Sequence, residues 1–145
     1  MSETPRLPGL TLADADWLVA SALEVAAERG FPPLAVAVLD VSGAAIVLRR
    51  ADGGMPMTSR IAVAKARTAL LALQPSGQIA LPGAIVDSIQ HLNGGDFIPF
   101  AGGILITDDG VVLGAAGASG AHATEDEGAV QTAVHRWHEY RSRTQ

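Results

Sequence analysis

Cysteine is absent from this chain of 145 residues, and lysine occurs only once, as Lys65. Without cysteine the chain forms no disulfide, has no thiolate nucleophile and cannot bind zinc or an iron–sulfur cluster through cysteine sulfur. Aromatic residues make up only 4% of the chain, so the side chains on which single-stranded nucleic acids stack are scarce. Several common classes of catalytic and binding site are therefore excluded at the outset.

Charged residues are also few, at 17%, and the 15 acidic and 10 basic side chains give a formal net charge of -5. The basic residues are scattered, whereas binding to nucleic acid or to an anionic membrane needs a basic patch. No apolar run approaches the roughly 20 residues of a transmembrane helix, and residues 1–9 do not resemble a signal peptide. We therefore expect a cytoplasmic protein without a nucleic-acid or membrane partner.

Apolar residues, in contrast, are abundant: they make up 48% of the chain, and the mean hydropathy is +0.27. A chain of this length and composition can bury one real core. We expect an irregular tail over residues 1–10 and a single domain over residues 11–145. An apolar surplus in a small protein is often buried between subunits, which predicts a homo-oligomer.

Apolar residues recur at three- and four-residue steps in segments bounded by glycine or proline, which predicts helices. Two of these segments begin with the spacing of a capping box, Thr11 with Asp14 and Thr124 with Glu127. The expected helices are residues 11–30, residues 58–73 with Thr58 or Ser59 as the cap, a short helix from Ala84, and a last helix from Thr124.

Short runs rich in Val, Leu and Ile, separated by turns that contain glycine, predict two β-hairpins. The expected strands are residues 34–40, 44–50, 104–107 and 111–118. Strands joined by short turns pair antiparallel, so helices and hairpins together indicate an α+β domain with a mainly antiparallel sheet.

Six fragments, in this order along the chain, resemble motifs of the GlcG/HbpS-like (DUF336, "haem-degrading") family. They are residues 37–43, 50–53, 61–69, 102–104, 109–114 with 117–120, and 126–127. The resemblance covers the chain from about Leu10 to its end. It implies a profilin-like five-stranded antiparallel sheet flanked by helices, assembly into dimers or larger oligomers, and loops around Asp52, Gly102 and Gly103 that line a pocket.

Lys65 stands in an otherwise apolar helical segment, between Ala64 and Ala66. A lysine presented to a pocket would hold a ligand carboxylate, and a desolvated lysine can act as a base or a Schiff-base amine. The alternative is a lysine on the helix surface, or one that extends from a buried helix into solvent. The family resemblance favours a role in a site.

His122 precedes the last helix and is followed by several carboxylates, among them Asp126. It is a candidate general base oriented by a carboxylate, although acidic residues also suit the first turn of a helix for electrostatic reasons alone. His135 and His138 share a helix face, and we interpret them as solvated surface residues rather than as metal ligands. No metal site is predicted.

We therefore predict a protein that binds a small anionic or planar molecule in a pocket near a subunit interface. The expected ligand-binding residues are Asp52, Lys65, Gly102 and Gly103. The cofactor stays open, with haem as one example.

No histidine precedes His91 in the sequence, so a haem iron would be bound by His91, by His122 or by a group other than imidazole. One alternative function is a small cofactor-independent enzyme of secondary or catabolic metabolism, an isomerase, lyase, hydratase or hydrolase. It would use Lys65, His122 and Asp126 as its acid/base set. A second alternative is a structural subunit of a larger enzyme, so the sequence leaves open whether the protein is an enzyme.

Overall fold

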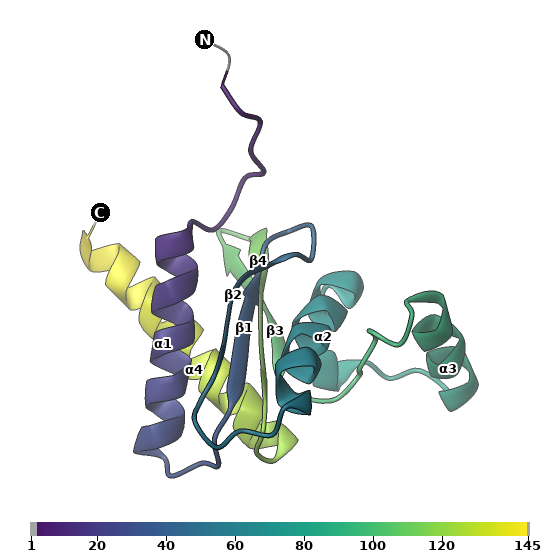
Figure 1. The fold of residues 1–145 in the computed structure, drawn as a ribbon. Coiled ribbons are helices and arrows are strands. Elements are labelled where there is room, and N and C mark those ends of the chain that lie inside the picture. Colours follow the sequence, from purple (N-terminus) through teal and green to yellow (C-terminus); the bar gives the residue numbers. More distant parts are fainter. Residues whose placement is uncertain (1–2, 145) are drawn as a thin grey trace.

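A computed structural model of the chain describes residues 3–144 (Figure 1). Its elements, in chain order, are α1 (Leu12–Glu28), β1 (Ala35–Leu39), β2 (Ala45–Arg50), α2 (Met57–Ala72), the 3₁₀ turn η1 (Ser76–Gln78), α3 (Gly83–Leu92), β3 (Gly103–Asp108), β4 (Val111–Ser119) and α4 (Ala123–Thr144). The predicted helices and strands all form, with small shifts at their ends. Residues 3–10 contain no helix or strand. Met1 and Ser2 of the predicted tail and Gln145 of the predicted domain lie outside the described residues.

The four strands form one antiparallel sheet in the order β2-β1-β4-β3, so the predicted α+β class is confirmed. The five strands implied by the family resemblance are not found, because the described residues supply four. The long segment between α2 and β3 forms η1 and α3 instead. Its prolines at positions 75, 82 and 99 lack the N–H group that a strand ladder needs.

Helices cover both faces of the sheet, with α1 and α4 on one side and α2 on the other (Figure 1). The central strand β1 is buried at every position because both of its faces are covered. Val36 and Val38 belong to the larger core with α1 and α4, whereas Ala35, Ala37 and Leu39 pack under α2. The small side chains on the second face let α2 approach the sheet closely.

Glycines in the sheet bring α2 closer still. Gly103 of β3 and Gly117 of β4 are partners in the ladder. A Cβ atom at Gly103 would overlap the carbonyl of Lys65, and one at Gly117 would overlap the carbonyl of Ala62. The backbone of α2 therefore lies directly on these two strands, which positions Lys65 at the edge of the sheet.

The beginnings of the helices test the predicted caps. The capping box of α1 is confirmed, since the Asp14 N–H donates to Thr11 Oγ1 (3.1 Å) and the Thr11 N–H donates to Asp14 Oδ2 (3.0 Å). For α2 the prediction of Thr58 or Ser59 is wrong. This helix begins after Pro56 without a side-chain cap, because the Thr58 hydroxyl donates backwards to the Met55 carbonyl (2.7 Å).

The predicted capping box of Thr124 and Glu127 is also wrong. Helix α4 begins at Ala123, and the Glu125 carboxylate accepts a hydrogen bond from the His122 N–H (3.2 Å). The carboxylate that accepts a hydrogen bond at the beginning of α4 is thus that of Glu125, two residues before the predicted Glu127, and its donor is the free N–H group of His122.

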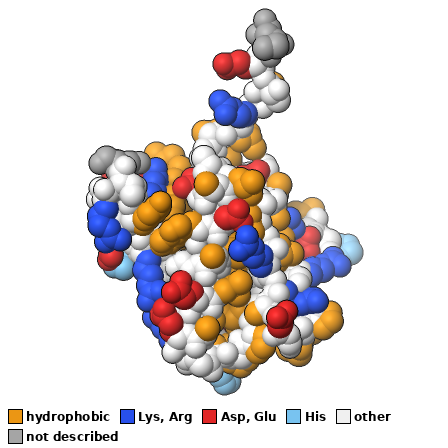
Figure 2. All heavy atoms as spheres, turned by 60° about the vertical axis from the view of Figure 1, so that its left-hand side comes forward, with side chains coloured by type: hydrophobic (Ala, Val, Ile, Leu, Met, Phe, Trp, Pro, Cys, Tyr) orange, Lys and Arg blue, Asp and Glu red, His pale blue; other side chains and the backbone are white. Residues whose placement is uncertain are grey.

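The outer surface of α1 and α4 carries charges of both signs. Arg49 pairs with Asp16 of α1 (2.7 Å), and Arg136 of α4 pairs with Glu28 (3.2 Å). On the face shown in Figure 2, acidic and basic side chains are mixed, so this face has no large patch of one charge. None of the helices in the described part of the chain is both long and apolar enough to cross a membrane.

The close contact between α2 and the sheet predicts that Gly117→Ala destabilises the fold. The added methyl group meets a helix backbone that cannot move without opening the sheet contact, so we expect a loss of about 1–3 kcal/mol in the free energy of unfolding. Gly83→Ala is the matched control, because a Cβ atom there meets nothing within 4 Å. It should change stability by no more than about 1 kcal/mol. Urea unfolding measures both, and equal effects would contradict the close approach of α2.

Candidate functional site

Lys65 and Asp126 form a buried ion pair at the end of β4. The Lys65 ammonium donates to Asp126 Oδ2 (3.1 Å) and to the Ala118 carbonyl (3.2 Å). Their side chains are only 6% and 2% exposed. Lys65 belongs to α2 and Asp126 to α4, so the pair joins the helices that cover opposite faces of the sheet.

Gly102 leaves the space that the lysine side chain occupies. A Cβ atom at Gly102 would lie 2.7 Å from Lys65 Cδ and 2.8 Å from Lys65 Nζ, and the backbone there has a φ of +137°, which favours glycine. The Gly102 carbonyl accepts a hydrogen bond from the Ala118 N–H (2.9 Å), and the Gly103 N–H donates to Ser76 Oγ (2.9 Å). The two glycines thus enclose Lys65 with backbone on the side of β3.

Asp126 is held at both of its oxygens. Oδ1 accepts the Ala121 N–H (2.9 Å), while Oδ2 accepts the Lys65 ammonium. Burial raises the pKa of the Asp126 carboxyl above its ordinary value of 3.8, and the Ala121 hydrogen bond and the charge of Lys65 oppose that rise. The carboxylate therefore depends on these two partners to remain ionised in the interior.

His122 lies next to this pair but faces solvent. It is the residue before α4, its carbonyl accepts the Asp126 N–H (2.8 Å), and its side chain is exposed. The structure thus brings Lys65, Asp126, Gly102 and Gly103 together in the interior and holds His122 beside them at the surface.

Asp52 stands apart from this group. The pairings of Ala35 with Arg50 and with Ser119 place the ends of β2 and β4 on opposite sides of β1, about 10 Å apart at the usual strand spacing. Asp52 is exposed and lines a separate hollow of about 150 Å³ beside Phe31. It shares an end of the sheet with Lys65 without contacting it.

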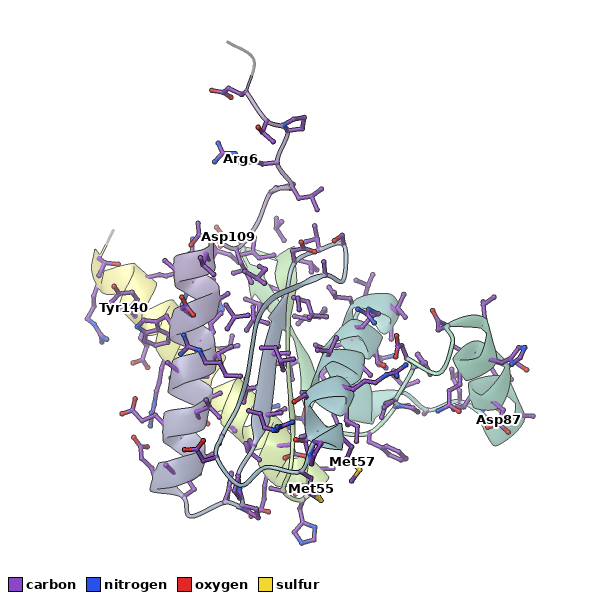
Figure 3. The ribbon with its side chains drawn as sticks, viewed as in Figure 1. Arg6, Met55, Met57, Asp87, Asp109 and Tyr140 are labelled. Atoms are coloured by element: carbon purple, nitrogen blue, oxygen red, sulfur yellow. The ribbon has the colours of Figure 1, made fainter. Side chains whose placement is uncertain are left out.

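Sequence reasoning missed three exposed residues at the same end of the sheet. Met55 and Met57 flank the beginning of α2 and lie at the lower end of the molecule in Figure 3. Arg60 lines a hollow of about 190 Å³ together with Met57 and Ile61. Two exposed methionines around a proline are a usable signal, because methionine is common at adaptable binding surfaces.

The remaining histidines fit their interpretation as surface residues. His135 pairs with Glu139 (2.8 Å), and the His138 ring lies against Trp137 at 5.0 Å between centroids. No group of three or more His, Asp or Glu side chains within residues 3–144 could hold a metal ion.

The buried ion pair predicts that Lys65→Met lowers the free energy of unfolding, and that the size of this loss depends on pH. This change leaves the Asp126 carboxylate buried without its cation, which should lower the free energy of unfolding by about 3–5 kcal/mol near neutral pH. It also removes a group that lowers the pKa of Asp126. When the pKa of a carboxyl is higher in the folded state than in the unfolded state, that carboxyl stabilises the fold fully at a pH below its ordinary pKa of 3.8. This contribution is lost as the pH rises through the folded-state pKa. The cost should therefore be smallest at acidic pH.

Denaturant unfolding of Lys65→Met from acidic to neutral pH measures this dependence. The double variant Lys65→Met with Asp126→Leu should recover most of the loss, because it removes both charges. Arg49→Met is the control, since it breaks an ion pair whose side chains are about half exposed and should cost no more than about 1 kcal/mol. A cost of Lys65→Met that does not change with pH would contradict the role of Asp126.

Comparisons with known proteins identify relatives over nearly the whole chain. A family model described as haem degrading protein HbpS-like matches residues 10–135. An uncharacterized 15.0 kDa protein from the dhaT-dhaS intergenic region of Citrobacter freundii is 29% identical over 137 residues, which cover 92% of this chain and 96% of that protein. The corrinoid adenosyltransferase PduO of Salmonella typhimurium is 28% identical over 128 residues, which cover 86% of this chain but 38% of that enzyme.

Solved structures share the fold. Protein ORFY of Klebsiella pneumoniae has a TM-score of 0.80 at 24% identity, covering 94% of this chain and 96% of that one. HbpS has a TM-score of 0.78 at 28% identity, with coverages of 90% and 92%. PduOC, solved as a complex with haem, has a TM-score of 0.78 at 27% identity, with coverages of 87% and 93%. Because the family model matches most of its length, the chain belongs to the HbpS-like family, as its sequence motifs predicted.

Proposed function

We propose that this protein binds a planar, anionic small molecule of the haem class at the end of the sheet where α2 and α4 begin. The observation that carries the proposal is the likeness to PduOC, whose structure contains haem, at 27% identity over 87% of this chain. The description of the matching family as haem-degrading supports the same ligand class.

The exposed residues at this end of the sheet fit the requirements of haem. Haem iron is commonly held by a histidine or methionine side chain, and His122, Met55 and Met57 are all exposed here. The guanidinium of Arg60 lies 3.7 Å from the Asp96 carboxylate in a partly exposed ion pair, and it could exchange that partner for a ligand carboxylate such as a haem propionate. Haem would supply the iron and its redox chemistry, whereas His122 would bind the iron and Arg60 would orient the ring.

Lys65 and Asp126 act in this proposal as positioning residues. Their ion pair and the hydrogen bond from Ala121 hold the first turn of α4 against the sheet, and His122 directly precedes that turn. Direct contact between Lys65 and a ligand would require the ion pair to open, because the lysine is already bonded to Asp126 and to Ala118.

One chain covers only part of such a ligand. The two hollows at this end have volumes of about 150 Å³ and 190 Å³, whereas pockets that enclose a small molecule measure about 300–1,000 Å³. A second copy of the chain would complete the enclosure, which agrees with a homo-oligomer and a site near a subunit interface. Asp52 would then lie on the rim of the site.

The comparisons give no support to the alternative of an acid/base enzyme. Lys65 and Asp126 are also buried too deeply to reach a substrate as the fold stands, and only His122 of that set is exposed.

Titration with haem tests the proposal. The wild-type protein should change the Soret absorption of haem, and His122→Ala should weaken binding by about tenfold or more or alter the band. His91→Ala is the matched control, since this exposed histidine lies at the far end of α3, and it should bind as the wild type does. A wild-type protein that leaves the haem spectrum unchanged would overturn haem as the ligand. An unaltered spectrum of His122→Ala would overturn its role as the iron ligand.

A further inference from the structure

A hollow of about 480 Å³ lies between α1 and α4, the two helices on the side of the sheet away from α2 (Figure 1). Pockets that hold a small molecule measure about 300–1,000 Å³. The side chains that line this hollow come from one stripe of each helix, residues 17, 20, 21 and 24 of α1 and residues 136, 139 and 143 of α4. The hollow is therefore built by two regular helices, which hold side chains more precisely than loops do.

One wall of the hollow is aromatic. Trp17 lines it, and the indole of Trp17 stacks on the Tyr140 ring with 5.2 Å between the ring centroids and 17° between the ring planes. Tyr140 lies near the end of α4, beside the first half of α1, in Figure 3. The stacking fixes the orientation of the indole, so Trp17 offers a ligand a rigid apolar surface.

The floor of the hollow carries a hydroxyl group that is free to bind. Ser21 is only 7% exposed, and its hydroxyl makes no hydrogen bond within residues 3–144. A serine in a helix often donates to the carbonyl four residues earlier, as Ser88 does to Ala84 (3.1 Å). None of the fully buried side-chain N or O atoms in the described part of the chain lacks a partner. Ser21 Oγ must therefore be open to the hollow, where a ligand can bond it.

The charges around the hollow balance one another. Arg136 and Arg143 line it together with Glu24 and Glu139. Arg136 is paired with Glu28 (3.2 Å), and Arg143 lies 4.0 Å from Glu139. An ionic ligand would have to compete with these partners, whereas a hydroxyl group need not, because a paired guanidinium keeps further N–H donors and a paired carboxylate keeps further lone pairs. The lining therefore suits a neutral ligand that is rich in hydroxyl groups.

We propose that the hollow between α1 and α4 binds a neutral mono- or disaccharide. The C–H face of the sugar ring lies against the indole of Trp17. The hydroxyl groups at the rim of the ring donate to the Glu24 carboxylate, accept from the Arg143 guanidinium and bond Ser21 Oγ. A sugar ring is apolar on its faces and both donates and accepts hydrogen bonds at its rim, so it uses every kind of group that this hollow presents.

The saccharide site is separate from the site proposed for haem. At 1.5 Å per residue, Arg136 lies about 20 Å along α4 from the first residue of that helix, Ala123. His122, the proposed iron ligand, directly precedes Ala123, and the other residues proposed to bind haem lie around the beginning of α2. The two kinds of binding can therefore be measured independently on the same protein.

Tryptophan fluorescence detects a ligand in this hollow, because Trp17 is partly exposed whereas Trp137 is only 1% exposed. Glucose, galactose, mannose, xylose and maltose are titrated at millimolar concentrations, with glucuronate and glycine betaine as charged competitors. A neutral sugar should change the emission of the wild type, and Trp17→Phe should abolish the change. No response to any of the neutral sugars, or tighter binding of glucuronate or betaine, would overturn the proposal. A response that persists in Trp17→Phe would overturn the placement of the site.

Calorimetric titration of two further variants, with the neutral sugar that binds the wild type best, tests the polar contacts. Glu24→Ala should weaken binding by about tenfold or more, because it removes a charged acceptor, and Ser21→Ala should weaken it by about twofold to tenfold. Asp87→Ala is the matched control for Glu24→Ala, since it removes the same charge from an exposed position of α3, far from the hollow (Figure 3), and should bind as the wild type does.

The melting temperature and the haem titration show whether these effects are specific. Glu24 is exposed and forms no ion pair within residues 3–144, so Glu24→Ala should melt no lower than the wild type. Both Glu24→Ala and Ser21→Ala should leave the haem spectrum as in the wild type, so failure of the saccharide site and failure of the haem site are distinguishable. Unchanged sugar affinity in both variants would count against the proposal.

Discussion

The ion pair between Lys65 and Asp126 is the constraint on which the arrangement of both helical layers depends. Charges buried this deeply are tolerated only when their remaining hydrogen-bonding capacity is also used. The Ala118 carbonyl and the Ala121 N–H meet that need, and Gly102 leaves the space for the lysine. The end of β4, the turn before β3 and the helices on both faces are therefore positioned by one group of interactions.

Features with local signals could be predicted from the sequence, and features that depend on distant residues could not. Thr11 and Asp14 are three residues apart, and their capping box forms as expected. Lys65 and Asp126 are separated by 61 positions, so both were placed in a candidate site without any indication that they pair. Met55 and Met57 around Pro56 are a local signal for a binding surface, but the sequence does not show which loops meet at one end of the sheet, so Met55 was missed.

The errors have identifiable physical causes. The cap of α4 was misplaced because the sequence offers two acidic residues at a three-residue spacing, Glu127 after Thr124 and Glu125 after His122. In the structure Glu125 accepts the hydrogen bond from the free N–H of His122. The fifth strand rested on family resemblance alone, in a segment whose prolines oppose strand pairing. The isolation of α3 was not predictable either, because an amphipathic pattern shows that a helix has an apolar face and does not show what covers it.

The depth of the ion pair also restricts how this fold can change during evolution. Replacement of Lys65 alone leaves an uncompensated carboxylate in the interior, and replacement of Asp126 alone leaves an uncompensated ammonium group. An apolar pair at these positions would pack without either charge, yet each single step toward it is unfavourable. The two positions are therefore expected to covary among homologues, so that lineages retain both charges or have lost both.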